Sequence, residues 1–432
     1  MHEHQFLETA DRIGRRLCRD AVWSGDRCNW LGWAMDMVGR GWSAVYKAQT
    51  PYLYDGTAGI GLFLARLYRL TRDPLEKTVA IGALNRAIKA FPEVPDGLQP
   101  SVYSGGAGVA YAALEIGEAL EDERMIAWGT AALRQACSHP PAERWLDILG
   151  GSAGAIQVLL YAARRFDSPE FVELALAHAR MLLRTAAKSD AGWSWDTLPG
   201  QGEKHLLGYG HGAGGIGCAL LDVWAETGEP EYREAAFQAF RFERSHFNPE
   251  QHNWPDLRSM AAYGIPATQQ VFATAWCHGG PGIGLSRLRA LELLSDGSVH
   301  KELTNDLNEA RHSTATACSR PFPAIGSLCL CHGLGGNADL LIAEADRSGR
   351  SDLRQIAENA GRDAMEQVQS SDLPWPCGVN GAGETPNLML GLAGIGHFYL
   401  RLYDSRRVPS ILLLGQGTKA RERRAAPLAV SA

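Results

Sequence analysis

The sequence predicts an all-α fold, an α/α toroid of seven helical hairpins with glycine-rich turns at one mouth of the ring. Glycine pairs of the form G-x-x-G recur seven times, and successive pairs begin 46 to 67 residues apart. An apolar run with helical periodicity follows each pair, and a more charged helical segment comes after it. One hairpin of helices plus loops of variable length accounts for a repeat of this size.

The glycine pairs mark the expected starts of the inner helices. Glycine suits these positions because the backbone must turn tightly there and neighbouring helices must approach closely, which a Cβ hinders. The pairs are Gly56/Gly59, Gly105/Gly108, Gly151/Gly154, Gly212/Gly215, Gly279/Gly282, Gly333/Gly336 and Gly391/Gly394. Because all seven turns would lie at one end of the ring, a site assembled from several turns would lie at the mouth of the central cavity.

The two helices of a hairpin are expected to differ in character. Residues 60–68 are mostly apolar, whereas residues 75–84 are amphipathic. A chain of 432 residues often forms two or three domains, but a closed helical ring is one domain of unusual size. We therefore predict one domain over residues 1–414 and a disordered tail over residues 415–432, where a basic stretch lies among alanine and polar residues.

Composition indicates a cytoplasmic protein. Nine cysteines without short regular spacing favour a reducing compartment over a disulfide scaffold. The first residues lack the basic start and apolar core of a signal peptide, and no apolar run approaches the ~20 residues needed to span a bilayer. A net charge of −6 gives no support for a nucleic-acid partner. We expect neither nucleic-acid binding nor a membrane span.

Three candidate metal ligands lie in two of the glycine-rich turns. Cys277 precedes His278-Gly279, and the pair Cys331-His332 precedes Gly333, 54 residues after the first cysteine. Two thiolates and one imidazole suit a Zn²⁺ ion with an open fourth position, which is typical of a catalytic zinc site. An isolated Cys-His pair would be a weak signal, but its recurrence within a repeat strengthens it. Cys329 is a possible competing ligand, although a buried structural cysteine is the preferred interpretation.

With these motifs in place, the chain resembles the lanthionine synthetase C-like family, the cyclases of lanthipeptide biosynthesis, from about Phe6 to Leu414. The stretches that carry the resemblance are Trp276-Cys277-His278-Gly279, Cys331-His332-Gly333, Gly210-His211-Gly212 and Asn253-Trp254-Pro255-Asp256-Leu257-Arg258. The last of them is similar to the cyclase domain of the fused synthetases.

The resemblance implies a role for five residues. Cys277, Cys331 and His332 would bind the zinc, and His211 with Asp147 would match the family's acid/base histidine and its supporting aspartate. Addition of a cysteine thiol to dehydroalanine or dehydrobutyrine requires a thiolate and then a proton for the enolate. Coordination to zinc deprotonates a thiol, and a histidine titrating near neutrality can deliver the proton. Asp147 could instead only cap the helix that follows it.

Two positions depart from the nisin cyclase type. Ala273 stands four residues before the first zinc cysteine, where that type has an arginine, and His278 follows the cysteine, where that type has a tyrosine. His278 therefore becomes a third candidate catalytic residue, for proton transfer or enolate stabilisation.

Three functions are open at this point. The favoured one is a stand-alone cyclase that forms (methyl)lanthionine thioether rings in a dehydrated precursor peptide, which a separate dehydratase or kinase/lyase must supply. The second is zinc-dependent addition of glutathione or another small thiol to dehydroamino acids. The third is a non-catalytic peptide-binding scaffold. Trp195-Asp196 and Trp254-Pro255-Asp256 could suggest carbohydrate binding, but we interpret them as loop anchors.

Overall fold

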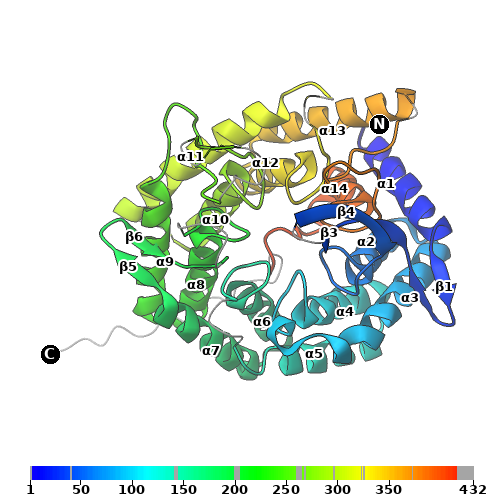
Figure 1. Ribbon diagram of the computed structural model, residues 1–432, viewed down its shortest axis with the longest axis horizontal. Helices are drawn as coiled ribbons and strands as arrows, with labels where there is room; N and C mark the ends of the chain where they lie inside the picture. Colours follow the sequence, from blue (N-terminus) through cyan, green and yellow to red (C-terminus); the bar gives the residue numbers. More distant parts are fainter. Residues whose placement is uncertain are drawn as a thin grey trace.

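The computed structural model confirms the helical ring (Figure 1). Within the described residues, seven inner helices are surrounded by seven outer helices. The structure describes residues 2–38, 41–140, 145–198, 205–258, 265–266, 269–294, 297–322, 324, 326–371 and 373–415. In these ranges no helix is both long and apolar enough to cross a membrane.

The inner helices pack side by side around the ring, and α14 closes it against α2. They are α2 (Thr57–Thr71), α4 (Gly106–Leu120), α6 (Ser152–Phe166), α8 (Ala213–Thr227), α10 (Gly280–Leu293), α12 (Leu334–Ser348) and α14 (Leu392–Asp404). Their residues are buried along most of their length, because they face the core on one side and the outer helices on the other.

Each outer helix packs most extensively on one inner helix. They are α1 (His2–Arg19), α3 (Pro74–Ala90), α5 (Glu123–Ala136), α7 (Pro169–Thr185), α9 (Pro230–Arg244), α11 (Ser298–Cys318) and α13 (Ser351–Ser371). Six pairs are consecutive in sequence. The seventh joins the two ends of the chain, since α1 packs on α14, where Phe6 stacks on Tyr399 with ring centroids 6.1 Å apart. Figure 1 shows this closure between the blue and orange-red helices.

Each glycine pair begins an inner helix, as predicted. The first glycine of every pair is the residue that caps the helix N-terminus. A Cβ on the second glycine would lie 1.6 to 2.2 Å from the carbonyl oxygen six residues earlier in all seven turns. No side chain fits such a gap, so the turn itself requires the second glycine.

The described residues also form short β-hairpins, which were not predicted from the sequence. The antiparallel pairs are β1 (Val22–Ser24) with β2 (Arg27–Asn29), β3 (Leu31–Val38) with β4 (Gly41–Ala48), and β5 (Ala187–Ser189) with β6 (Gly192–Ser194). Two single-turn 3₁₀ helices, η1 (Phe91–Glu93) and η2 (Asp96–Leu98), follow α3. These ribbons form no sheet layer, so the core remains helical.

The end of the described chain fills the centre of the ring. After α14, residues 408–414 run inward and are mostly buried. The Tyr103 hydroxyl donates to the Ile411 carbonyl at 2.7 Å, and Trp276 Nε1 donates to the Leu412 carbonyl at 3.0 Å. The predicted tail, 415–432, lies outside the described residues except for Gly415, so the domain boundary at 414 stays a prediction.

Candidate active site

A closed ring of backbone hydrogen bonds joins the seven glycine turns at one mouth of the toroid. In each turn the residue two positions before the first glycine donates its amide hydrogen to the equivalent carbonyl of a neighbouring turn, over N···O distances of 2.8 to 3.3 Å. The participants, in order, are Tyr54, Tyr103, Leu149, Gly210, Cys277, Cys331 and Met389, which donates back to Tyr54. Cys277 and Cys331 therefore occupy equivalent positions in adjacent turns.

In three of the seven turns the next position is a histidine. His211, His278 and His332 lie directly before Gly212, Gly279 and Gly333 in three successive turns. The repeat thus gathers all three imidazoles on the part of the rim that holds the two cysteines.

The two cysteine thiols contact each other. Cys277 and Cys331 are within hydrogen-bonding range, and this contact, together with burial, raises the pKa of the Cys277 thiol well above its usual value. The hydroxyl of Tyr54 also contacts the Cys331 thiol. A buried thiol that resists ionisation and contacts a second thiol is suited to a cation that would replace its proton.

His332 is held by one of its two ring nitrogens. Nε2 lies 3.0 Å from the carbonyl oxygen of Gly378. A carbonyl can only accept, so Nε2 carries a proton, and in the neutral ring the lone pair lies on Nδ1. Metal-binding histidines commonly donate their second N–H to a backbone carbonyl in this way. Burial lowers the pKa of His332, but contact with the Cys329 thiol and the charge of Cys277 outweigh it and raise the value to about 9.

The donors fit a zinc ion in type but do not form a complete ligand cluster. In the described ranges, no group of three or more His, Cys, Asp or Glu side chains is arranged closely enough to hold a metal. Cys277 and Cys331 come together, whereas the third predicted ligand, His332, is turned toward Cys329 and Gly378. Zinc binding by these three residues therefore stays a prediction.

His211 and Asp147 form a close pair beside the thiols. His211 Nδ1 lies 2.6 Å from Asp147 Oδ2, while Asp147 Oδ1 accepts the amide hydrogen of Gly150 at 2.7 Å. The aspartate therefore stabilises its own turn and orients the histidine at the same time. Burial lowers the pKa of His211, but the charge and hydrogen bond of Asp147 outweigh burial, so the net pKa is raised.

His278 stacks on His211, with ring centroids 5.8 Å apart and an interplanar angle of 29°. Burial, followed by the charge of Arg258, lowers the pKa of His278 to about 3. One ring nitrogen hydrogen-bonds the backbone of Leu207, and Nε2 is buried without a partner among the described residues. The pKa values of the two stacked histidines are therefore shifted in opposite directions.

A family model described as "Lanthionine synthetase C-like protein" matches residues 47–413. The chain belongs to this family. The solved structure of nisin cyclase shares the fold, with a TM-score of 0.59 and 17% identity over 84% of this chain and 91% of that chain. No curated protein matches the chain.

Two glycoside-active proteins superpose less closely. An unsaturated glucuronyl hydrolase from Bacillus sp. GL1 has a TM-score of 0.44 and 14% identity, over 73% of this chain and 84% of that one. A glycoside hydrolase family 76 mannosidase from Bacteroides thetaiotaomicron has a TM-score of 0.46 and 12% identity, over 93% and 99%.

In this lanthionine synthetase C-like protein the guanidinium of Arg258 is close enough to the two thiols to interact with them electrostatically. Arg258 follows the bend at Asn253–Asp256 and pairs with Asp256, 2.6 Å from Arg258 Nη2 to Asp256 Oδ2. Burial lowers the pKa of Arg258. The hydrogen bond and charge of Asp256, together with the charges of Cys277 and Cys331, outweigh burial, so the net pKa is raised. Arg258 belongs to a stretch that carries the family resemblance, but it was not predicted to be a site residue. Ala273, by contrast, contributes only its carbonyl, to Asn253.

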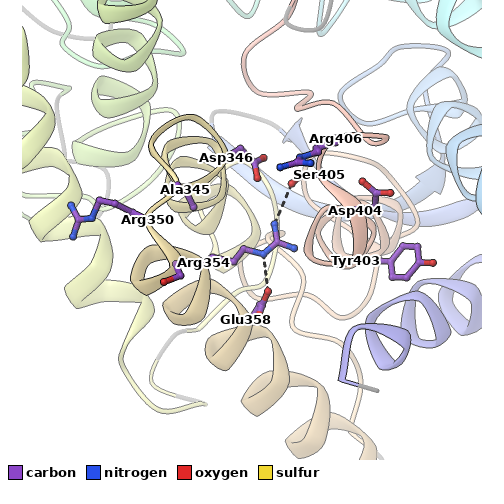
Figure 2. A pocket seen from close by; sticks show the side chains of 11 residues that line it. Ala345, Asp346, Arg350, Arg354, Glu358, Tyr403, Asp404, Ser405 and Arg406 are labelled. Atoms are coloured by element: carbon purple, nitrogen blue, oxygen red, sulfur yellow. Dashed lines mark hydrogen bonds and ion pairs between the residues drawn. The ribbon is translucent and has the colours of Figure 1, made fainter.

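The opposite end of the ring carries a surface pocket of about 370 Å³. It lies between the C-terminal ends of α12 and α14 and the start of α13, and Figure 2 shows its charged lining. Arg354 is held there by Glu358 at 2.7 Å and by Ser405 at 3.2 Å. Because inner helices start at the glycine mouth, this pocket is remote from the cysteines and histidines.

Proposed function

We propose that this protein is a zinc-dependent lanthipeptide cyclase. It would add cysteine thiols of a dehydrated precursor peptide to dehydroalanine or dehydrobutyrine, forming (methyl)lanthionine thioether rings. The observation that carries the proposal is the meeting, at one mouth of the ring, of a touching thiol pair with a carboxylate-oriented histidine. Membership of the lanthionine synthetase C-like family supports the same reaction.

The zinc would be held by the Cys277 and Cys331 sulfurs and by Nδ1 of His332, the nitrogen that carries the lone pair when the ring is neutral. When bound, zinc supplies thiolate character to the incoming peptide cysteine, whose free thiol has a pKa of about 8.5. His332 remains oriented by Gly378, whose carbonyl fixes the tautomer.

His211 would deliver the proton that completes the reaction. Asp147 holds Nδ1 and raises the pKa of His211, which favours the imidazolium at neutral pH. After the sulfur bonds the β-carbon, the double bond is lost and negative charge develops on the α-carbon and the adjacent carbonyl oxygen. Transfer of the imidazolium proton to the α-carbon restores a neutral peptide and a neutral histidine.

His278 would accept a hydrogen bond rather than donate a proton. Its pKa of about 3 keeps the ring neutral, and its unpartnered Nε2 lies in the same buried layer as His211. A neutral ring whose other nitrogen already hydrogen-bonds the Leu207 backbone carries its lone pair on Nε2.

The experiment uses a synthetic peptide with one dehydroalanine and one cysteine. Ring closure leaves the mass unchanged but protects the cysteine from an alkylating reagent, so mass spectrometry after alkylation reports the thioether. We expect protection with zinc-loaded wild type and none with Cys331→Ala. Wild type that adds glutathione to the peptide but leaves the peptide cysteine free would favour the small-thiol function, and no addition of either kind would contradict the enzyme.

A further inference from the structure

The stretch before Arg258 is fastened beside the cysteine turn. Asn253 Nδ2 donates to the Ala273 carbonyl at 3.0 Å, and Asn253 Oδ1 accepts the Gly280 amide hydrogen at 2.9 Å. The amide of Asp256 donates to the Val271 carbonyl at 2.7 Å. These bonds hold the stretch along the segment that leads into Cys277 and the start of α10.

Asp256 fixes the direction of the Arg258 guanidinium. The Asp256 side chain is 1% exposed, and it accepts the Arg258 backbone amide at 3.0 Å, Nε at 3.1 Å and Nη2 at 2.6 Å. A two-point contact between a carboxylate and a guanidinium sets the orientation as well as the distance. Nη1 donates to no described residue, and the Arg258 side chain is 35% exposed, so Nη1 is available to a ligand.

The guanidinium charge acts on four side chains of the candidate site. It acts on Cys277, Cys331 and His278, and it also acts on His211. Asp256 is the carboxylate that faces it directly, and it is already used in the ion pair. A cation oriented by a buried partner, with free donors beside the thiols, is arranged for an anion that appears only during the reaction.

We propose that Arg258 is a catalytic residue, whose free Nη1 donates hydrogen bonds to the carbonyl oxygen of the dehydroamino acid as that oxygen becomes an enolate. This inference rests on the proposed function and names the group that carries its developing charge. The sulfur–carbon bond forms while the carbon–carbon double bond breaks, and its electron pair moves toward the carbonyl oxygen beside Arg258. The pair returns to the α-carbon when His211 gives up its proton. Arg258 stays protonated throughout.

The test compares Arg258→Met with the matched control Arg124→Gln. Arg124 pairs with Asp122 in the same local pattern, with the backbone amide 2.9 Å from Asp122 Oδ1 and Nη2 3.1 Å from Oδ2, but it lies exposed at the start of α5. The substrate is the synthetic peptide with one dehydroalanine and one cysteine. The same peptide with its cysteine alkylated serves as a binding probe.

We expect Arg258→Met to lower kcat by about 10²-fold, the usual loss for one oxyanion donor. Zinc content and the Kd of the alkylated peptide should stay within about threefold of wild type, since the contact strengthens only in the transition state. Guanidinium ions added to Arg258→Ala should restore part of the rate, which a structural role would not allow. Arg124→Gln should match wild type in kcat, zinc content and the Kd of the alkylated peptide.

Several results would overturn the inference. One is a kcat of Arg258→Met within threefold of wild type; another is a lost rate that guanidinium leaves unchanged. If the neutral variants do not fold, Arg258→Lys keeps the charge but not the fork, and a wild-type rate in that variant contradicts the assignment. Wild type that forms no thioether with peptide or glutathione contradicts the proposed function, and the role of Arg258 fails with it. If wild type and Arg258→Met are equally active, the result contradicts the role of Arg258 but not the proposed function.

Discussion

His211 Nδ1 lies 2.6 Å from Asp147 Oδ2, although 64 residues separate the two in sequence. The contact exists because each residue lies in a glycine turn at the same mouth of the ring, Asp147 just before α6 and His211 just before α8. It holds Nδ1 of His211 and leaves Nε2 as the nitrogen that Asp147 does not contact. It also raises the pKa of the imidazole against the effect of burial.

Asp147→Asn is expected to shift the pH dependence of turnover. A donor that must be protonated loses activity as the pH rises through its folded-state pKa. The carboxylate is what raises the pKa of His211, so the amide should move the alkaline fall in kcat to lower pH. Initial rates across a pH series would measure it. An alkaline limb at the wild-type position in Asp147→Asn would mean that His211 is not the proton donor.

His211→Asn should separate proton transfer from metal binding. The variant loses an acid worth typically 10²–10⁴-fold in rate, but it leaves Cys277, Cys331 and His332 unchanged. We therefore expect wild-type zinc content with at least about 100-fold slower thioether formation. His139→Asn, which changes an exposed histidine outside the site, should keep the full rate. Full activity of His211→Asn would contradict its role.

Gly108→Ala should destabilise the fold strongly. A Cβ at this position would lie 1.6 Å from the Val102 carbonyl oxygen, so the turn before α4 must open. Overpacking typically costs 1–3 kcal/mol, and we expect a loss at or above about 3 kcal/mol in urea unfolding. Gly97→Ala is the control, because its Cβ would lie 3.5 Å from Trp145 Nε1, an ordinary contact. Equal stability of the two variants would contradict the steric role of the glycine turn.

The glycine turns also explain how much of the fold could be predicted. In every repeat a Cβ on the second glycine would clash with a carbonyl oxygen, so glycine is required at the same position of each turn. The seven inner helices could therefore be located from the glycine pairs. The hairpin of β3 and β4 has no such repeated signal and was missed. The pairing of α1 with α14 depends on ring closure, which no local pattern records.

The site could be predicted only in part, for a similar reason. Aligning the turns on their first glycine places Cys277 with Cys331, and His211 with His278 and His332. Most of the site residues could therefore be predicted from their positions in the repeat. Arg258 lies outside any glycine turn. Its approach to the thiols depends on the hydrogen bonds of Asn253 and Asp256, which join segments through tertiary contacts.

His178 is expected to make the fold acid-sensitive without any part in catalysis. It is fully buried in α7, with Nδ1 3.0 Å from the Ser152 hydroxyl and Nε2 3.4 Å from the Cys137 carbonyl. Burial lowers its pKa to about 4. The unfolded chain therefore binds the extra proton first, and stability should fall as the pH drops from about 6.5 toward 4, by up to about 3 kcal/mol from this residue.

Urea unfolding at pH 7 and pH 5 measures this effect. His178→Gln keeps a polar side chain but cannot titrate, so its loss of stability between the two pH values should be smaller than that of wild type. An unchanged difference between pH 7 and pH 5 would show that His178 is not a source of the acid sensitivity.

The zinc content of the purified protein, measured by elemental analysis for wild type and Cys331→Ala, tests the central claim most directly. The account predicts about one zinc per chain in wild type and a loss of that zinc in the variant, because one of its two thiolate ligands is gone. A wild-type protein that stays metal-free when zinc is offered would contradict the thiol-activating site, and with it the proposed cyclase.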